Sequence, residues 1–502
     1  MAASSPHPHQ LSPLDKLMPR VYVRQIYCFP STDPRATEVL GEGLAGTVAD
    51  VPYLLSGITS SGPRQMDISL SEPYQCLDDL FSCNDLSSSL DYDVLRAGNF
   101  SPAAFVVPEL FPRDTQPPYP DPAPVFRARA SPINGGFLLC VAIHHSTTDI
   151  TGFGSLLKIW ASHCRTGSSR AVGFEPSWLD RRVLLRPFAI PPPPPFPKLL
   201  HTLEMGGAAP PRLTGPPVRP ADYRTGIFFF AREGLEGLKC AANEHLASRG
   251  GISPSWVSTG DVLAALLWSA LFTAEQQQQQ QGDPSSNSAA AQDSSTSTVD
   301  FPVNFRSRAL DPPLPRSYLG AAFAMTSARA PRADLLSVAR FHESSDPSSY
   351  PIAALSTIAA AHRRTVADVD ASSVTATLAY LSYLDSFSHH KPPSSSDRAD
   401  DDDAGEESNP PVVILGPSRR DGISIVSWAD QGARELDWGP AVGWCEAVRL
   451  ARMANRRYPI VLPRIPGAGG GLEVIVCFEK GYMERFTRTW GVEKYAVLRC
   501  LS

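Results

Sequence analysis

A run of prolines near the middle of the chain, IPPPPPFP at residues 190–197, divides the sequence into two parts. Each proline ring fixes φ, and the residue before a proline avoids the helical region, so this run must be extended. The residues around it, about 186–220, show little periodicity. We therefore predict a long crossover that joins an N-terminal domain, residues 1–185, to a C-terminal domain, residues 221–502. A chain of 502 residues is also too long for one ordinary core.

Strand patterns alternate with helix patterns on both sides of the crossover, which indicates a mixed α/β protein. In the stretch GFGSLLKIWASHCR, the residues Leu156, Leu157, Trp160 and Cys164 fall on one side of a helix. Strands are predicted at 21–29 and 137–144, helices at 35–51, 152–165 and 258–274, and a strand followed by a helix at 225–245 and 472–486.

Two low-complexity segments interrupt the C-terminal part. Residues 275–298 contain a glutamine run followed by a Ser- and Ala-rich tract, and residues 391–411 are rich in Ser and Asp. Neither segment can bury enough apolar surface to offset the entropy of ordering it. Both are predicted to be disordered insertions on the surface, and the acidic run is interpreted as solvated charge.

Composition excludes several classes of function. The net charge is −6 and no basic run is present, which argues against nucleic acid and anionic membranes as partners. No stretch of about 18 apolar residues could span a membrane, and the N-terminus does not have the pattern of a secretory signal. The nine cysteines include no CxxC pair, which indicates free thiols in a reducing compartment. A cytoplasmic location follows as a prediction.

The stretch FLLCVAIHHSTTDITGFG, residues 137–154, carries the clearest chemical signal. A buried apolar strand ends on His144 and His145, and Asp149 follows on a turn of small residues before a glycine-containing helix. Functional groups often lie at such strand-to-helix turns. An imidazole with a pKa of about 6.5 could take a proton from a hydroxyl group if its surroundings hold it in place.

Other kinds of catalytic site find no support in the sequence. A zinc site would need a third ligand, and His163 and His201 make no recognised pattern with the histidine pair. No G-x-S-x-G elbow and no glycine-rich phosphate loop occurs. This leaves a histidine that acts directly on a substrate proton, without a metal or a protein nucleophile. A second constellation, DWG at 437–439, lies near the C-terminus.

Together these motifs resemble the BAHD acyl-CoA-dependent acyltransferases, which carry HxxxD and D-F-G-W-G motifs in this order. Here the motifs read HSTTD from His145 to Asp149 and DWGP from Asp437 to Pro440. The segments LSPLDKLMPRVYVRQIYCFP, VSTGDVLAALLWSAL, VDFPVNFRSRALDPPLPRSYLG and GGGLEVIVCFEKGYMERF are also similar to family segments. The resemblance covers nearly the whole chain and is greatest to the fungal branch that includes trichothecene 3-O-acetyltransferases.

The resemblance implies two α/β domains similar to chloramphenicol acetyltransferase, with a solvent channel between them. Acyl-CoA, with acetyl-CoA favoured, would be the co-substrate, and no bound cofactor or metal is implied. The acceptor would be a hydroxyl group of a small secondary metabolite, and the protein is expected to be a monomer. His145 would act as the general base in a direct ternary mechanism.

The resemblance also implies roles for further residues. Asp149 would point away from substrate and pair with Arg306, holding the loop of His145. Asp437 would have a similar architectural role, and we place His145, Asp149 and Asp437 together in the predicted catalytic set. Ser427 and Trp428 are candidate donors to the oxyanion. Candidate contacts to coenzyme A are Ser258, Thr259, Arg308 and Lys239.

Three alternatives stay open at this point. The enzyme could acylate an amine, or it could be a condensation-like enzyme that takes the acyl group from a carrier protein, because condensation enzymes also use an HHxxxD motif. A non-catalytic binding protein with the same fold is the third alternative. Intact His145 and Asp149 argue against it, and the DWG segment favours coenzyme A as the carrier.

Overall fold

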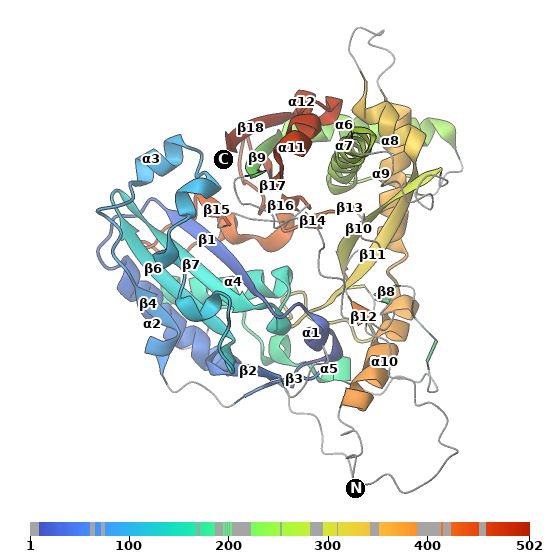
Figure 1. Cartoon of the computed structure of the whole chain (residues 1–502). Coiled ribbons are helices and arrows are strands. Elements are labelled where there is room, and N and C mark those ends of the chain that lie inside the picture. The colour runs from blue at the N-terminus through green and yellow to red at the C-terminus, as the bar shows by residue number, and fades with distance from the viewer. Residues whose placement is uncertain are drawn as a thin grey trace, which may run out of the picture.

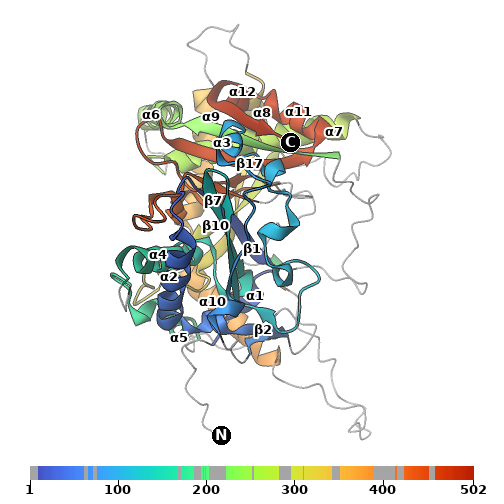
Figure 2. The same ribbon diagram turned by 90° about the vertical axis from the view of Figure 1, so that its left-hand side faces the viewer.

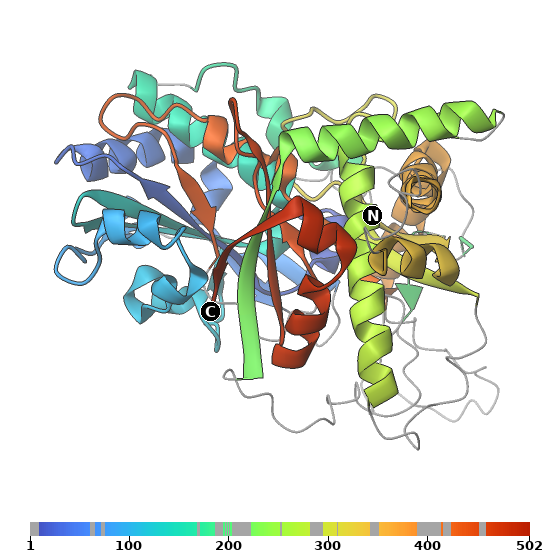
Figure 3. The same cartoon turned by 90° about the horizontal axis from the view of Figure 1, so that it is seen from above.

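Two neighbouring α/β parts make up the structure, a computed structural model (Figure 1; Figure 3 shows the two parts from above). It describes residues 10–60, 66–71, 76–167, 171–185, 194–195, 197, 199, 201–202, 222–250, 254–281, 295–308, 310–341, 351–388, 413–414, 423–450 and 458–502. Most of the crossover predicted at 186–220, and all of the insertion predicted at 391–411, lie outside these residues.

The first part is built on a five-stranded sheet with the order β15-β1-β7-β6-β4. Strand β7 lies in the middle, antiparallel to both β1 and β6, and all nine of its residues are buried. Helices α2 and α4 pack against each other beside this sheet (Figure 2). The bounds are β1 (Tyr22–Phe29), β4 (Phe81–Cys83), β6 (Phe126–Ile133), β7 (Gly136–His144), β15 (Ala447–Arg449), α2 (Ala36–Asp50) and α4 (Ile150–Thr166).

The second part contains a five-stranded sheet, β14-β16-β17-β9-β18, and a three-stranded sheet, β11-β10-β13. Helix α7 packs against α6, α8, α9, α11 and α12, and its Trp268 is buried completely. The strands are β9 (Tyr223–Ala231), β10 (Thr296–Asn304), β11 (Phe323–Pro331), β13 (Ile423–Ser424), β14 (Val426–Ser427), β16 (Ile460–Val461), β17 (Gly471–Glu479) and β18 (Ala496–Leu501). The helices are α6 (Arg232–Arg249), α7 (Thr259–Gln281), α8 (Arg332–Ala339), α9 (Ile352–Ala367), α10 (Ala371–Ser388), α11 (Lys480–Thr487) and α12 (Trp490–Tyr495).

Short elements complete the described fold. They are α1 (Pro13–Leu17), α3 (Tyr92–Ala97), α5 (Arg182–Leu185), β2 (Gly57–Ser60), β3 (Ile68–Leu70), β5 (Ala123–Pro124), β8 (His201–Thr202) and β12 (Val413–Ile414). Strands β8 and β12 pair with each other, so the region predicted as a crossover contributes at least one strand. Within the described part of the chain, no helix combines the length and the apolar character that a membrane span requires.

The strands and helices predicted from periodicity are confirmed, but two features differ from expectation. The disorder predicted for 275–298 is wrong at both ends, because α7 runs to Gln281 and β10 begins at Thr296, and residues 282–294 lie outside the described residues. Glutamine has a good helix propensity, so the glutamine run extends the helix. In addition, β15 and the preceding DWG segment, which the sequence order puts in the C-terminal half, pack into the sheet and core of the N-terminal half.

Candidate active site

The two histidines lie where the buried strand β7 meets helix α4. Strand β7 ends at His144, a single 3-10 turn covers His145–Thr147, and Asp149 is the N-cap of α4. The backbone N–H of His145 donates to the carbonyl of Val21 at 2.8 Å, which ties the turn to the start of β1. We call residues 145–149 the catalytic turn. The buried strand β7 fixes the position of its last residue, His144, and thereby the place where the catalytic turn begins.

The imidazole of His145 is held by the turn itself. Its Nδ1 lies 3.0 Å from the carbonyl oxygen of Thr148. A carbonyl oxygen can only accept a hydrogen bond, so Nδ1 must carry the proton, and the neutral ring then has its acceptor lone pair on Nε2. The side chain is half-buried. Nε2 is therefore the atom of His145 that can take a proton from a substrate.

His144 is suited to a structural role. Only 2% of it is exposed, its ring packs edge-on against Tyr22, and its Nδ1 accepts from the Ser146 N–H at 3.3 Å. Burial, followed by the nearby His145 and Arg20, lowers the pKa of His144 to about 4. The ring is neutral at pH 7.

The low pKa of His144 makes stability depend on pH. Between pH 6.5 and about pH 4, the unfolded chain binds a proton at His144 that the folded protein excludes, so the free energy of unfolding falls as pH decreases. By pH 5 we expect a loss on the order of 2 kcal/mol relative to pH 7.5. Urea unfolding of the wild type and of His144→Gln at pH 5 and pH 7.5 measures this loss in the free energy of unfolding. Wild-type and variant curves that fall in parallel would contradict this prediction.

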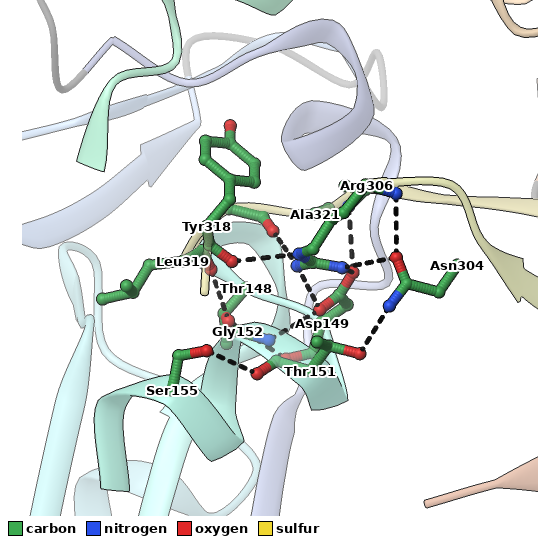
Figure 4. Close-up of polar contacts among 12 residues, drawn as sticks. Thr148, Asp149, Thr151, Gly152, Ser155, Asn304, Arg306, Tyr318, Leu319 and Ala321 are labelled. Carbon is green, nitrogen blue, oxygen red and sulfur yellow. Dashed lines mark hydrogen bonds and ion pairs between the residues drawn. The ribbon is translucent and has the colours of Figure 1, made fainter. Parts of the chain in front are cut away.

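Asp149 and Arg306 form a buried, bidentate ion pair (Figure 4). Arg306 Nη2 lies 2.7 Å from Asp149 Oδ1, and Nη1 lies 2.9 Å from Oδ2. The carboxylate also accepts from the N–H groups of Gly152 and Ala322, both at 2.9 Å. All its lone-pair directions are therefore used within the protein, which leaves none for the imidazole of His145 and agrees with the pairing that the resemblance implies. The ion pair holds the end of the catalytic turn.

Residues 318–322 of the C-terminal half lie against the same turn (Figure 4). Arg306 donates to the carbonyl oxygens of Tyr318 at 3.1 Å and Gly320 at 2.7 Å. The hydroxyl of Thr148 lies 2.6 Å from the carbonyl oxygen of Leu319. We call residues 318–322 the backbone strap. It connects the catalytic turn with the half of the molecule that carries α7 and β10.

Gly152 allows the strap to approach α4 closely. A Cβ atom added at this position would overlap the Leu319 carbonyl oxygen and the Thr148 hydroxyl. We expect Gly152→Ala to lower the free energy of unfolding by about 1–3 kcal/mol and to reduce activity, because the strap must move. Gly237→Ala is the control, since nothing lies within 4 Å of its Cβ on the exposed side of α6. It should raise stability by about 0.5–1 kcal/mol. Thermal unfolding compares the two, and equal effects would contradict the strap contact.

The segment with Ser427 and Trp428 reaches the same region. Residues 429–431 form a short helical turn that packs on the first turns of α4, where a Cβ at Gly154 would overlap the Gln431 carbonyl. The backbone N–H of Trp428 donates to Val461 at 2.8 Å, so it cannot also bind an oxyanion. The Ser427 side chain is exposed and its Oγ accepts from the Ala429 N–H at 3.4 Å. The Ser427 hydroxyl and the indole N–H of Trp428 are therefore the groups of these two predicted residues that can donate to an oxyanion.

Asp437 lies elsewhere. Its Oδ1 accepts from the Gly439 N–H at 2.9 Å, which closes a turn. Gly439 has φ of 87°, and a Cβ there would overlap Arg165 near the C-terminal end of α4. Helix α4 has 17 residues, so this end lies roughly 25 Å from the catalytic turn. The structure therefore does not bring Asp437 to His145, and we do not keep Asp437 in the catalytic set.

Three predicted coenzyme A contacts meet at the N-terminus of α7. The Ser258 hydroxyl lies 2.6 Å from Asp261 Oδ2 and accepts from the Asp261 N–H, which caps the helix. The Thr259 hydroxyl donates to Glu236 at 2.8 Å, and Lys239 forms an ion pair with the same carboxylate. These polar groups are thus held in one cluster on α6 and α7.

Arg308 lies next to a second arginine that the sequence did not suggest. Burial and the charge of Arg363 both lower the pKa of Arg308. Arg363 on α9 stacks 4.1 Å over the half-exposed ring of Trp256 and lies 3.8 Å from Asp261. Only the packing of α9 against α7 brings these groups together, so no local pattern could have revealed Arg363. Asn304 and Thr151, whose side chains bond across the two halves at 3.3 Å, were missed for the same reason.

The fold, with the strand-to-helix turn that carries His145, can be compared with known proteins. Among protein families, residues 87–341 match the Transferase family. The chain therefore belongs to the Transferase family, and its resemblance to the BAHD acyltransferases, including the fungal branch, is confirmed.

Two proteins with sequences similar to this chain are named as O-acetyltransferases from fungi. The chain is 29% identical to O-acetyltransferase anaAT of Neosartorya fischeri over 44% of this chain and 45% of that protein, so this match spans about half of each. It is 24% identical to O-acetyltransferase ptmV of Penicillium ochrochloron over 95% and 94% of the two chains. The crystal structure of Fusarium sporotrichioides TRI101 with coenzyme A and T-2 superimposes with a TM-score of 0.70 at 21% identity, covering 98% of this chain and 99% of that one. This likeness establishes the fold.

Proposed function

We propose that the protein is an acyl-CoA-dependent O-acyltransferase that transfers an acetyl group to a hydroxyl of a small secondary metabolite. The observation that carries the proposal is the imidazole of His145, whose Nδ1–H is fixed on Thr148 so that Nε2 is the basic atom. The names of the fungal relatives and the coenzyme A bound to TRI101 support the donor and the reaction.

The reaction follows from this arrangement. Nε2 of His145 takes the proton of the acceptor hydroxyl while the hydroxyl oxygen attacks the thioester carbonyl carbon. The new C–O bond forms, the carbonyl oxygen becomes an oxyanion, and Ser427 and Trp428 are the candidate donors to it. The C–S bond then breaks, and the imidazolium returns the proton to the coenzyme A thiolate. Positioned acid–base catalysis of this kind contributes about 10²–10⁴-fold, and no acyl-enzyme is required.

The donor would bind near the start of α7. Burial and the nearby charge of Arg363 lower the pKa of Arg308, and an anionic phosphate beside the two guanidinium groups would relieve their repulsion. Ser258, Thr259 and Lys239 lie in the neighbouring cluster. We propose that acyl-CoA and the acceptor meet at His145 between the halves 1–185 and 221–502, in a cytoplasmic monomer, as the sequence predicts.

A thiol-release assay tests the proposal. Acetyl-CoA is combined with hydroxylated terpenoid, alkaloid and polyketide acceptors, and with matched amine acceptors. Release that depends on a hydroxylated acceptor, with a product heavier by one acetyl group, supports an O-acetyltransferase. Release only with amines would contradict O-acylation, and no release with acetyl-CoA or longer acyl-CoAs would contradict coenzyme A as the carrier.

A further inference from the structure

A second buried ion pair, Asp15–Arg181, also contacts the catalytic turn. We propose that this pair positions His145 for catalysis, an inference that rests on the proposed function. Asp15 lies in α1 and Arg181 directly precedes α5, 166 residues later in the chain. Their side chains have no exposed surface, and Arg181 Nε lies 3.0 Å from Asp15 Oδ2.

Arg181 acts on the backbone of the turn. Its Nη2 donates to the carbonyl oxygen of Thr147 at 2.8 Å. This carbonyl belongs to the peptide group just before Thr148, and the Thr148 carbonyl is the acceptor for Nδ1 of His145. Rotation of the first peptide plane would turn the second one away from the imidazole. Arg181 therefore restrains the group that sets the orientation and tautomer of His145.

Both members of the ion pair are held by further contacts. The guanidinium of Arg181 lies 4.7 Å from the ring centroid of Tyr53, which places it over the aromatic face. Asp15 is fixed by a capping box, since its Oδ2 accepts from the Ser12 N–H at 2.9 Å and from the Ser12 hydroxyl at 2.7 Å. Both partners are therefore rigid, as accurate positioning requires.

The two ion pairs also share the backbone strap. Asp15 Oδ1 accepts from the Ala321 N–H at 2.8 Å, and Asp149 Oδ2 accepts from the next N–H, that of Ala322, at 2.9 Å. Asp15–Arg181 thus holds the middle of the turn through Thr147, while Asp149–Arg306 holds its end. Both ion pairs thus contact the catalytic turn, and the carboxylate of each pair bonds to the same strap.

Stability alone is a poor reason for such a pair. Desolvating two charges largely offsets their attraction, and apolar replacements of a buried pair are often neutral or stabilising. The hydrogen bonds to Thr147 and Ala321 are what an apolar pair could not supply. We therefore expect the double variant Asp15→Asn/Arg181→Met to fold with near wild-type stability and yet to be a slow enzyme.

Kinetics separate positioning from folding. For the double variant we expect kcat to fall by about 100-fold, the scale of an orientation error of about 1 Å, while KM for acetyl-CoA changes by less than about threefold. Arg181→Lys keeps a positive charge beside Asp15 but lacks the planar fork, so it should also remain stably folded while its kcat stays below that of the wild type. A folded double variant with wild-type kcat would overturn the proposal.

The matched control is the neighbouring pair Lys16–Asp385. Lys16 follows Asp15 in α1, its Nζ lies 2.8 Å from Asp385 on α10, and the side chains are 5% and 14% exposed. None of the contacts described for this pair reaches the catalytic turn. Lys16→Met/Asp385→Asn should alter stability and leave kcat within about twofold. An equal loss of kcat in this control would contradict the positioning role and leave Asp15–Arg181 with only a structural role.

A measurement without turnover distinguishes this proposal from the proposed function. Nitrogen-15 NMR of labelled histidine reports the His145 tautomer, with the resonance assigned by its loss in His145→Gln. The wild type should show protonated Nδ1, and Asp15→Asn/Arg181→Met should show mixed tautomers or a mobile ring. An unchanged His145 spectrum in the variant overturns the positioning role even if no acceptor is found. Inactive wild type with the expected NMR change contradicts only the proposed function.

Discussion

Replacing His145 by alanine is expected to lower acceptor-dependent kcat by about 10²–10⁴-fold. The reason is that the variant lacks Nε2, the basic atom that takes the acceptor proton in the proposed reaction. KM for acetyl-CoA should change little, since His145 acts on the acceptor proton. The measurement is thiol release with saturating acetyl-CoA and the best acceptor. His145→Gln should be as slow as alanine, because an amide has no basic nitrogen.

Folding controls make this result interpretable. His145 is half-buried, and its Nδ1 bonds to Thr148 within the same turn, so His145→Ala should unfold within a few degrees of the wild type. Binding of coenzyme A by calorimetry should also persist. If His145→Ala keeps full turnover with a single acceptor, another group must remove the proton, and the proposed mechanism would be wrong.

Asp149→Asn is expected to produce the largest loss of stability, about 3–5 kcal/mol. The variant leaves the guanidinium of Arg306, 2% exposed, buried beside a neutral amide. Activity should fall as well, because the end of the catalytic turn and the Ala322 N–H lose their anionic partner. Urea unfolding at pH 7.5 measures the free energy directly, and CD spectra establish how much of the variant is folded.

Two further variants sharpen this test. Asp149→Asn/Arg306→Met removes both charges and should recover part of the lost stability without recovering kcat. Asp33→Asn is the exposed control, since its partner Arg35 is 68% exposed, and this variant should change stability far less than Asp149→Asn. Equal destabilisation by Asp33→Asn and Asp149→Asn would contradict the view that burial determines the effect.

The sequence by itself was sufficient for features that depend on near neighbours. The apolar run that becomes β7, the His145–Asp149 spacing and the amphipathic pattern of α4 are local, and each one predicted the observed element. The partner of Asp149 was also available, but only through the resemblance of the Arg306 segment to a known family. Spacing alone could not pair two residues that are 157 positions apart.

The tertiary structure decided which distant segments meet. Asp15 and Arg181 are unremarkable in sequence, and their charges became informative only when α1, the start of α5 and the backbone strap closed around Thr147. Asp437, by contrast, was placed in the predicted catalytic set with an architectural role, and it lies at the far end of α4. The physical reason is the same in both cases. Side-chain periodicity reports which face of an element is buried, whereas the identity of the element packed against that face depends on the path of the whole chain.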